Sequence, residues 1–137
     1  MRLRDKVAVV TGAGRGIGRH IALAFAEEGA HVVLAARSKA QLEDVAREVR
    51  DKGREAVPVP CDVTSAKEVE VLVSASRNAF DHLDILVNNA GISMRSKFLE
   101  YEDETFMEVL RVNLFGAYLV IKGFLPLIEA QRKGRIL

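Results

Sequence analysis

The stretch Thr11–Gly18 (TGAGRGIG) limits the fold of this chain more than any other segment. It places glycine at every second position from Gly12 to Gly18, directly after the apolar run VAVV at 7–10. Glycine weakens the interior of strands and helices, so this stretch predicts a tight turn between one strand and one helix. Such a turn also lets another molecule come close to the backbone. The spacing differs from G-x-G-x-x-G, and no Lys-Ser/Thr pair follows as in a P-loop.

Short apolar runs alternate with amphipathic helical segments along the rest of the chain. The predicted strands are 7–10, 31–36, 55–63 and 85–89, and the predicted helices are 17–28, 39–52, 65–80 and a long one from about 102 to a kink or end near Pro126. This alternation predicts an α/β fold, with a parallel sheet covered by helices on both faces. Right-handed crossovers then give a Rossmann-type doubly wound sheet with strand order 3-2-1-4. The third strand belongs at the edge because it contains two prolines.

Size, charge and cysteine content indicate a soluble, cytoplasmic protein. The 137 residues fit one domain, 1–137. A net charge of +1 without a basic face argues against nucleic acid and anionic membranes as partners. No apolar stretch approaches the ~20 residues that span a bilayer. The lone Cys61 suits a reducing compartment, and the histidines lie far from it and from one another, so no metal site is expected.

The end of the second predicted strand indicates which nucleotide the glycine turn would bind. A helix that begins at such a turn offers free backbone N–H groups and its positive dipole end to a phosphate. Sheets that bind NAD place an acidic residue about 20 residues further on, to hold the ribose 2′-hydroxyl. This chain has Arg37 there, with Arg15 in the glycine turn, and arginines suit a 2′-phosphate. We therefore expect NADP(H) rather than NAD(H). The alternatives are a plain turn and a solvated Arg37.

Four motifs together resemble one enzyme family. They are Thr11–Gly18, Asp62–Val63, Asn88–Gly91 (NNAG) and Asn113, in this order along the chain. On these residues the chain resembles the amino-terminal portion of the short-chain dehydrogenase/reductase family, and within it the 3-oxoacyl-[acyl-carrier-protein] reductase-like group. The resemblance implies an NADP(H)-dependent oxidoreductase that interconverts a carbonyl and an alcohol on a small-molecule substrate.

The resemblance also implies a role for each motif residue. The glycine turn would bind the pyrophosphate and the adenosine ribose, Arg37 the 2′-phosphate, Asp62 and Val63 the adenine, and the NNAG segment the ribose side of the cofactor. The implied cofactor-binding residues are Gly12, Gly14, Arg15, Gly16, Ile17, Gly18, Arg37, Asp62, Val63, Asn89, Ala90 and Gly91. Asn113, interpreted as a buried amide within an apolar helix, would hold a water of the proton relay.

Several of these residues also have a purely structural interpretation. Asp62 could cap the following helix, and Asn88 and Asn89 could bond the backbone at the edge of the sheet. Ile17 and Val63 could belong to the core. Asn113 could satisfy an irregularity of its helix, because a buried amide without partners costs about 1–3 kcal/mol.

The family's catalytic serine, tyrosine and lysine have no counterpart in this chain. In the family, the serine follows the fifth strand and Tyr-x-x-x-Lys lies on the next helix, whereas residues 134–137 look like the opening of that strand. Tyr118 and Lys122 have the spacing, but they follow Asn113 on one helix, so we interpret Tyr118 as packing and Lys122 as solvated. We expect an incomplete domain, truncated at the start of the fifth strand and inactive alone. The alternatives are an inactive nucleotide-binding or self-associating module and one part of a split enzyme.

The predicted helix at 106–125 is apolar on nearly all sides. A helix of this kind is normally buried all round. In the family fold it packs on the sheet and, in many members, against a partner subunit. In this chain the helix would lack part of that cover. We therefore expect an exposed apolar patch and a homo-oligomer formed through 106–125.

Overall fold

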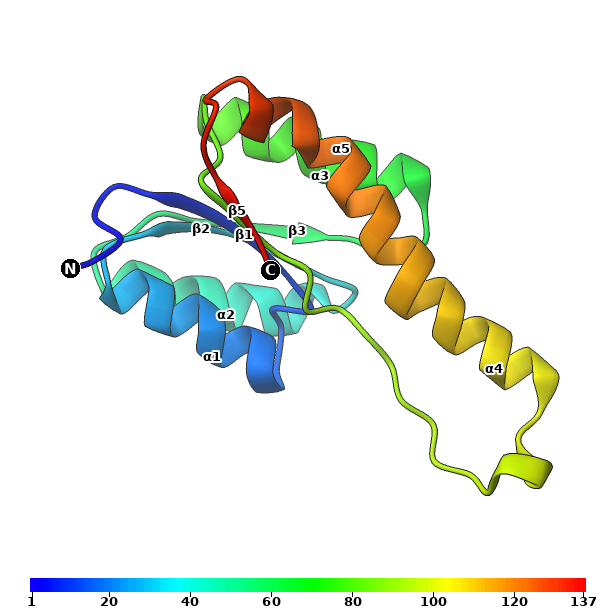
Figure 1. The fold of residues 1–137 in the computed structure, drawn as a ribbon. Coiled ribbons are helices and arrows are strands. Elements are labelled where there is room, and N and C mark those ends of the chain that lie inside the picture. The colour runs from blue at the N-terminus through cyan, green and yellow to red at the C-terminus, as the bar shows by residue number, and fades with distance from the viewer.

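The computed structural model describes residues 1 to 137 and contains one parallel sheet of five strands (Figure 1). The strands are β1 (Val7–Thr11), β2 (His31–Ala36), β3 (Ala56–Pro60), β4 (Ile85–Val87) and β5 (Arg135–Ile136). Their order, β3-β2-β1-β4-β5, confirms the predicted order 3-2-1-4. The two prolines of β3 lie on an edge strand, and β5 forms the other edge through its pairing with β4.

The helices fill every connection between the strands. The elements between β1 and β4 are α1 (Gly16–Glu27), α2 (Lys39–Asp51) and α3 (Ala66–Ala79), and those between β4 and β5 are a 3₁₀ turn (Phe98–Glu100), α4 (Asp103–Leu110), a π-helix (Arg111–Gly116) and α5 (Ala117–Glu129). Helices α1 and α2 cover one face of the sheet, and α3 and α5 cover the other (Figure 1). The Rossmann-type α/β fold is thereby confirmed.

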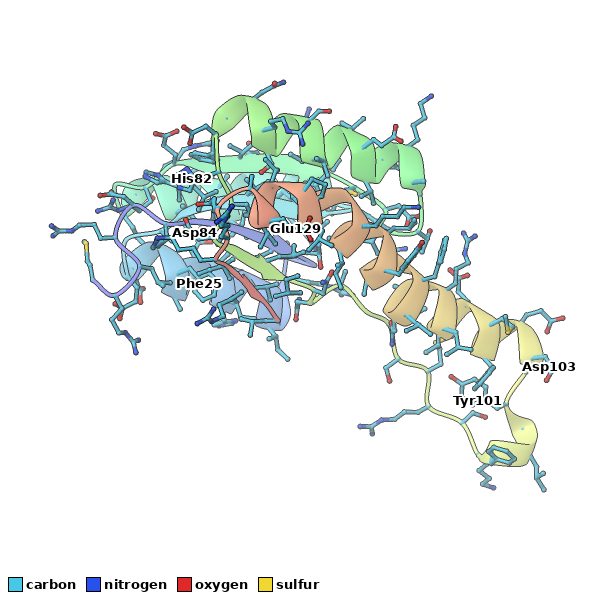
Figure 2. All side chains as sticks on the ribbon, turned by 45° about the horizontal axis from the view of Figure 1, so that its top comes forward. Phe25, His82, Asp84, Tyr101, Asp103 and Glu129 are labelled. Carbon is cyan, nitrogen blue, oxygen red and sulfur yellow. The ribbon has the colours of Figure 1, made fainter.

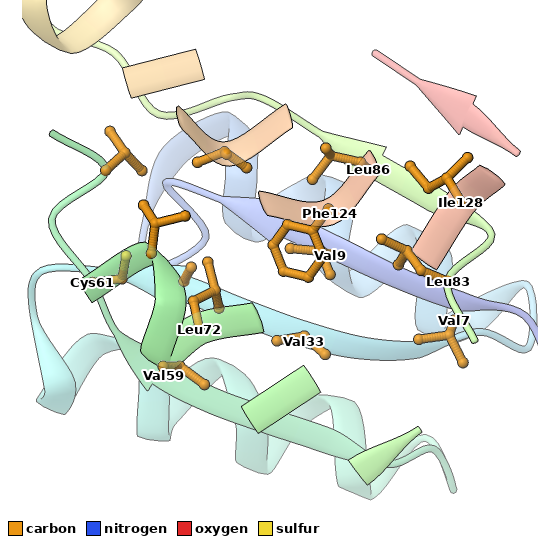
Figure 3. Close-up of a cluster of buried hydrophobic side chains, with 14 residues drawn as sticks. Val7, Val9, Val33, Val59, Cys61, Leu72, Leu83, Leu86, Phe124 and Ile128 are labelled. Carbon is orange, nitrogen blue, oxygen red and sulfur yellow. The ribbon is translucent and has the colours of Figure 1, made fainter. Parts of the chain in front are cut away.

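Both faces of the sheet are buried, which explains why its strands are apolar almost throughout. On the face of α3 and α5, Phe124 and Leu72 pack with Val9 and Val33, all without measurable exposure (Figure 3). Val10 belongs to the second core cluster, with apolar side chains of α1 and α2. The alternation along β1 therefore supplies both cores from one strand.

The segment before β5 differs from its prediction. Helix α5 does not end at Pro126 but continues to Glu129. Phe124 and Ile128, one turn apart on either side of the proline, are both buried, and their packing stabilises the helix across the lost hydrogen bond. The helix is interrupted earlier instead, by the π-helix that contains Asn113.

Residues 98–116, which we call the arm, project away from the sheet (Figures 1 and 2). No residue of α4 is buried, and Tyr101 and Asp103 lie at the far end of the arm from Asp84 (Figure 2). The large apolar residues exposed along it are Phe98, Leu99, Phe106, Met107, Leu110, Leu114 and Phe115. The predicted exposed apolar patch is thus confirmed.

One helical span, Asp103–Glu129, is long and apolar enough to cross a membrane by length and composition, with a mean hydropathy of 1.4 over 18 residues. The prediction that no stretch reaches this length is wrong, because the few charges in this span do not offset its apolar majority. A core helix of a folded α/β protein passes the same test. Here Val120, Phe124 and Ile128 pack within the core beside the sheet, so this single span is weak evidence for a membrane.

Candidate functional site

A cleft of about 440 Å³ opens where β1, β2, β3 and β4 end. This carboxyl edge of a doubly wound sheet is where such folds bind ligands. The predicted site residues that line the cleft are Gly12, Gly14, Arg15, Gly16, Ile17, Arg37, Asp62, Val63, Asn89, Ala90 and Gly91. Gly18 and Asn113 do not line it.

The turn from β1 to α1 leaves backbone N–H groups without acceptors beside the cleft. Gly12 and Gly16 have φ of +64° and +55°, in the left-handed region that glycine tolerates best. The helix has no side-chain cap at Arg15 and no acidic residue in its first turn. The N–H groups of Gly16, Ile17 and Gly18 have no acceptor in the chain. The positive end of α1 is therefore uncompensated, and it suits an anion.

Gly18 lies behind this turn and shapes it. A Cβ atom at Gly18 would overlap the carbonyl oxygen of Gly12 and would lie 2.5 Å from Nδ2 of Asn89. Only glycine lets α1 come this close to both neighbours. The contribution of Gly18 is therefore packing of α1 against the turn.

Thr11 connects the glycine turn to the segment after β4. Its buried hydroxyl accepts the N–H groups of Asn89 at 3.1 Å and Ala90 at 2.9 Å, and donates to the carbonyl of Val87 at 3.3 Å. The Asn89 amide donates to the carbonyl oxygens of Thr11 and Gly12 at 3.2 and 3.3 Å. The structural interpretation of Asn89 is therefore confirmed, and the same bonds hold the two walls of the cleft together.

Asp62 is fixed by its own loop. Thr64 donates to Oδ1 of Asp62 from its N–H at 2.9 Å and from its hydroxyl at 2.7 Å. These bonds, together with the charges of Arg37 and Arg111, lower the pKa of Asp62 below its ordinary value against the opposing effect of partial burial. The Ser65 side chain caps α3, so the capping alternative for Asp62 is wrong. Oδ2 of Asp62 is left without a hydrogen bond and can accept one from a ligand.

Ile17 and Val63 differ in their surroundings. Ile17 is 73% exposed, so its interpretation as a core residue is wrong. Val63 is only 7% exposed and belongs to the core around Phe124, although it also lines the cleft. A Cβ atom at Gly116 would lie 2.6 Å from Cγ2 of Val63, so the π-helix packs directly on this residue.

The cleft contains two exposed arginines, Arg15 and Arg37. Strand β2 ends at Ala36, and Arg37 stands where an acidic residue would hold a ribose hydroxyl. The acidic residues that line the cleft, Asp62 and Glu108, come from other parts of the chain. The corner after β2 therefore favours a ligand with an additional negative charge.

Asn113 is exposed, so its interpretation as a buried amide is wrong. It lies in the π-helix, as the alternative of a helix irregularity predicted. Its Oδ1 accepts the N–H of Ile92 at 2.8 Å, and its Nδ2 donates to the carbonyl of Ile92 at 2.9 Å. Asn113 therefore fixes Ile92, which itself lines the cleft.

Tyr118 and Lys122 lie outside the cleft. Tyr118 stacks on Phe115 with a centroid distance of 6.0 Å, and Nζ of Lys122 lies 5.7 Å from the Tyr118 ring centre. Tyr118 thus packs against its neighbours as interpreted, although at the surface, since it is 53% exposed. Lys122 is exposed, as its solvated interpretation requires.

Sequence reasoning missed other residues that line the cleft, notably Ser38, Gln41, Cys61, Ile92 and Glu108. The one available signal was Ser38, a serine placed to cap the helix that follows β2, and it does cap α2. The others meet only in the folded chain, because they come from α2, from the loops after β3 and β4, and from α4. No group of three or more His, Cys, Asp and Glu side chains is arranged to hold a metal ion.

Comparison with known proteins identifies the family. The family model for short chain dehydrogenases matches residues 6–137. The chain belongs to the short-chain dehydrogenase family. An uncharacterized oxidoreductase of Staphylococcus aureus (strain MW2) is 39% identical over 135 residues, which make up 98% of this chain and 58% of that relative.

Solved structures of short-chain dehydrogenases share the fold. L-sorbose reductase of Gluconobacter frateurii, complexed with NADPH and L-sorbose, has a TM-score of 0.92 and 37% identity over 99% of this chain and 53% of its own. An NAD⁺-bound xylitol dehydrogenase has a TM-score of 0.95 and 37% identity, again over 99% and 53%. The chain thus spans little more than half the length of these relatives.

Proposed function

We propose that this chain is the NADP(H)-binding part of a short-chain oxidoreductase that interconverts a carbonyl and an alcohol on a small molecule. The observation that carries the proposal is that the free N–H groups of α1 and the Arg37 side chain share one cleft. The N–H groups would bind the pyrophosphate, and Arg37 with Arg15 would bind the 2′-phosphate. The NADPH complex of L-sorbose reductase supports this cofactor. Xylitol dehydrogenase has the same fold and binds NAD⁺, so the fold alone does not select the cofactor. The proposed preference for NADP(H) over NAD(H) therefore rests on Arg37.

The other cleft residues fit the remaining parts of such a cofactor. Oδ2 of Asp62 would accept the adenine amine, Val63 would contact the adenine ring, and the segment Asn89–Gly91 would contact the ribose side. When bound, the nicotinamide supplies or accepts the hydride. Ile92 uses only one N–H and one lone pair of the Asn113 amide, and the rest would hold a water of the proton relay.

The general acid would come from outside residues 1–137. No tyrosine, lysine or histidine lines the cleft, so the proposed activity of this chain by itself is cofactor binding without turnover. Residues 1–137 would form a single, incomplete NADP(H)-binding domain of a cytoplasmic enzyme. The exposed apolar arm favours self-association through 106–125. The second candidate function is therefore an inactive, self-associating module or one part of a split enzyme.

Native mass spectrometry of the purified chain with NADPH and NADH tests the proposal. We expect a mass shift at lower concentration with NADPH than with NADH. The Arg37→Gln variant should lose this preference, whereas Arg47→Gln, an exposed arginine of α2 outside the cleft, should keep it. A stronger shift with NADH would contradict the assignment of NADP(H), and no shift with either would contradict nucleotide binding. Turnover of a carbonyl substrate by the chain alone would contradict the proposal that the general acid comes from outside residues 1–137.

A further inference from the structure

Gln41, in the first turn of α2, lies across the glycine turn. It lines the cleft together with Arg15, Arg37 and Ser38. A Cβ atom at Gly14 would lie 3.0 Å from Oε1 and 3.1 Å from Cβ of Gln41. The whole Gln41 side chain therefore runs beside the turn and reaches the cleft from α2.

The Gln41 carboxamide is free to bind a ligand. The one hydrogen bond of this residue outside the helix is made by its backbone N–H, which donates to Oγ of Ser38 at 3.3 Å. The side chain is exposed and its polar atoms have no protein partner. A carboxamide offers two N–H donors and one carbonyl acceptor.

The charges around Gln41 favour an anion. Arg15 and Arg37 line the same cleft, whose acidic residues are Asp62 and Glu108, and the first turn of α2 has no acidic residue. Asp62 enters from the loop after β3, and its Oδ1 is already bound by Thr64. An N–H donor in the same cleft as two guanidinium groups therefore adds to a site for a phosphate.

We propose that Gln41 is a specificity-determining residue, whose carboxamide donates to the 2′-phosphate of the adenosine ribose beside Arg37. This inference rests on the proposed function. The neutral amide binds the phosphate through its N–H groups. A carboxylate of the same shape would repel the phosphate and would accept a hydrogen bond from a 2′-hydroxyl.

The test compares two small probes that differ only in the 2′-phosphate, adenosine 2′,5′-bisphosphate and AMP. Calorimetric titration of the full chain measures both affinities. In Gln41→Glu we expect affinity for the bisphosphate to fall by about 10-fold or more, whereas affinity for AMP should not fall, because the carboxylate can accept a hydrogen bond from its 2′-hydroxyl. In Gln41→Met, which removes both polar groups at similar volume, only the bisphosphate should weaken, by about 3-fold or more.

The matched control is Ala40→Glu, which adds the same charge to the same helical turn at an exposed residue outside the cleft. It should change both affinities by less than about 2-fold. Equal losses in Gln41→Glu and Ala40→Glu would overturn the contact, and so would unchanged affinities in both Gln41 variants. Circular dichroism checks that each variant folds. If the unaltered chain does not prefer the bisphosphate, the NADP(H) assignment itself fails, and this result is distinct from a failure of Gln41 alone.

Discussion

Single glycines of this chain are explained by two different physical constraints. Gly18 has no room for a side chain, because a Cβ atom would overlap the Gly12 carbonyl oxygen. Gly53 has open space around it, but its φ is +75°, which residues with a Cβ atom rarely adopt. The first constraint is steric, and it fixes how closely α1 packs against the glycine turn that lines the cleft. The second is conformational and acts at the end of α2.

Substitution of these glycines should separate binding from stability. Gly18→Ala forces α1 away from the glycine turn, and we expect it to lower the free energy of unfolding by about 1–3 kcal/mol. Because the N–H groups of the first turn move, NADPH affinity should fall by about 10-fold or more. Gly53→Ala should cost about 1 kcal/mol and leave affinity unchanged. Urea unfolding and NADPH titration measure both, and full affinity in Gly18→Ala would refute the steric argument.

Cys61 should be almost inert in the folded chain. Burial, with smaller effects from Glu68 and Asp62, raises the pKa of its thiol to about 12. Because the thiolate is the reactive form, a disulfide reagent at about pH 8 should modify the folded chain at least ~100-fold more slowly than the chain unfolded in urea. Equal rates in the two states would mean that Cys61 is accessible.

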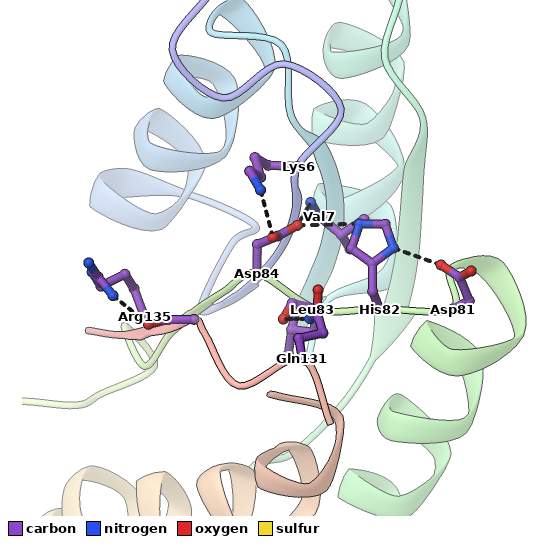
Figure 4. A network of polar contacts seen from close by, with 9 residues as sticks. Lys6, Val7, Asp81, His82, Leu83, Asp84, Gln131 and Arg135 are labelled. Carbon is purple, nitrogen blue, oxygen red and sulfur yellow. Dashed lines mark hydrogen bonds and ion pairs between the residues drawn. The ribbon is translucent and has the colours of Figure 1, made fainter. Parts of the chain in front are cut away.

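At the scale of elements, a polar network fastens β1 to the segment before β4 (Figure 4). Asp84 accepts the Val7 N–H and the Lys6 ammonium, each at 3.0 Å. His82 contacts Asp84 through Nε2 at 3.3 Å and the exposed Asp81 through Nδ1 at 2.7 Å. Burial alone would raise the pKa of Asp84, but the Val7 bond and the charges of Lys6 and His82 hold it below its ordinary value.

Asp84→Asn should therefore destabilise the chain in a pH-dependent way. At about pH 7 we expect a loss of about 1–3 kcal/mol, since a charged acceptor of buried bonds is removed. The pKa of Asp84 is lower in the folded state, so its stabilisation is present above about pH 4 and is lost as pH falls through the folded pKa. The difference between the two proteins should shrink with acidification. Asp81→Asn, at the exposed end of the network, should unfold like the unaltered chain; a deficit of equal size there would contradict the assignment to Asp84.

At the scale of the whole molecule, the apolar arm is the dominant surface feature. Met107, Leu110, Leu114 and Phe115 line one hollow on it. Monomeric soluble proteins rarely expose so continuous an apolar surface, so we expect the arm to drive association.

Leu114→Glu should reduce this association without unfolding the chain, because Leu114 is 67% exposed. Val71→Glu is the matched control, at a 55% exposed position on α3 outside the arm. Sedimentation velocity at micromolar concentration should detect oligomers of the unaltered chain and of Val71→Glu, and mainly monomers of Leu114→Glu. A purely monomeric unaltered chain would contradict the prediction.

The glycine turn, the strand order and most residues of the cleft could be predicted from the sequence. These features depend on relations between neighbours: the spacing of Gly12 to Gly18, the period of apolar residues, and the fixed hand of the crossovers that brings strand ends to one edge. Arg37 belongs to this group because it directly follows β2, and the apolar run 31–36 predicts the end of that strand at the observed residue.

Other features depended on contacts between segments that are distant along the chain. The burial that carries α5 past Pro126, the exposure of Asn113 and its bonds to Ile92, and the position of Gln41 beside Gly14 have no local signature. Periodicity indicates which face of a helix is apolar, but how much of that face is covered depends on how the other elements pack. For this reason the sequence located the cleft, whereas the three-dimensional packing decided which additional side chains reach it.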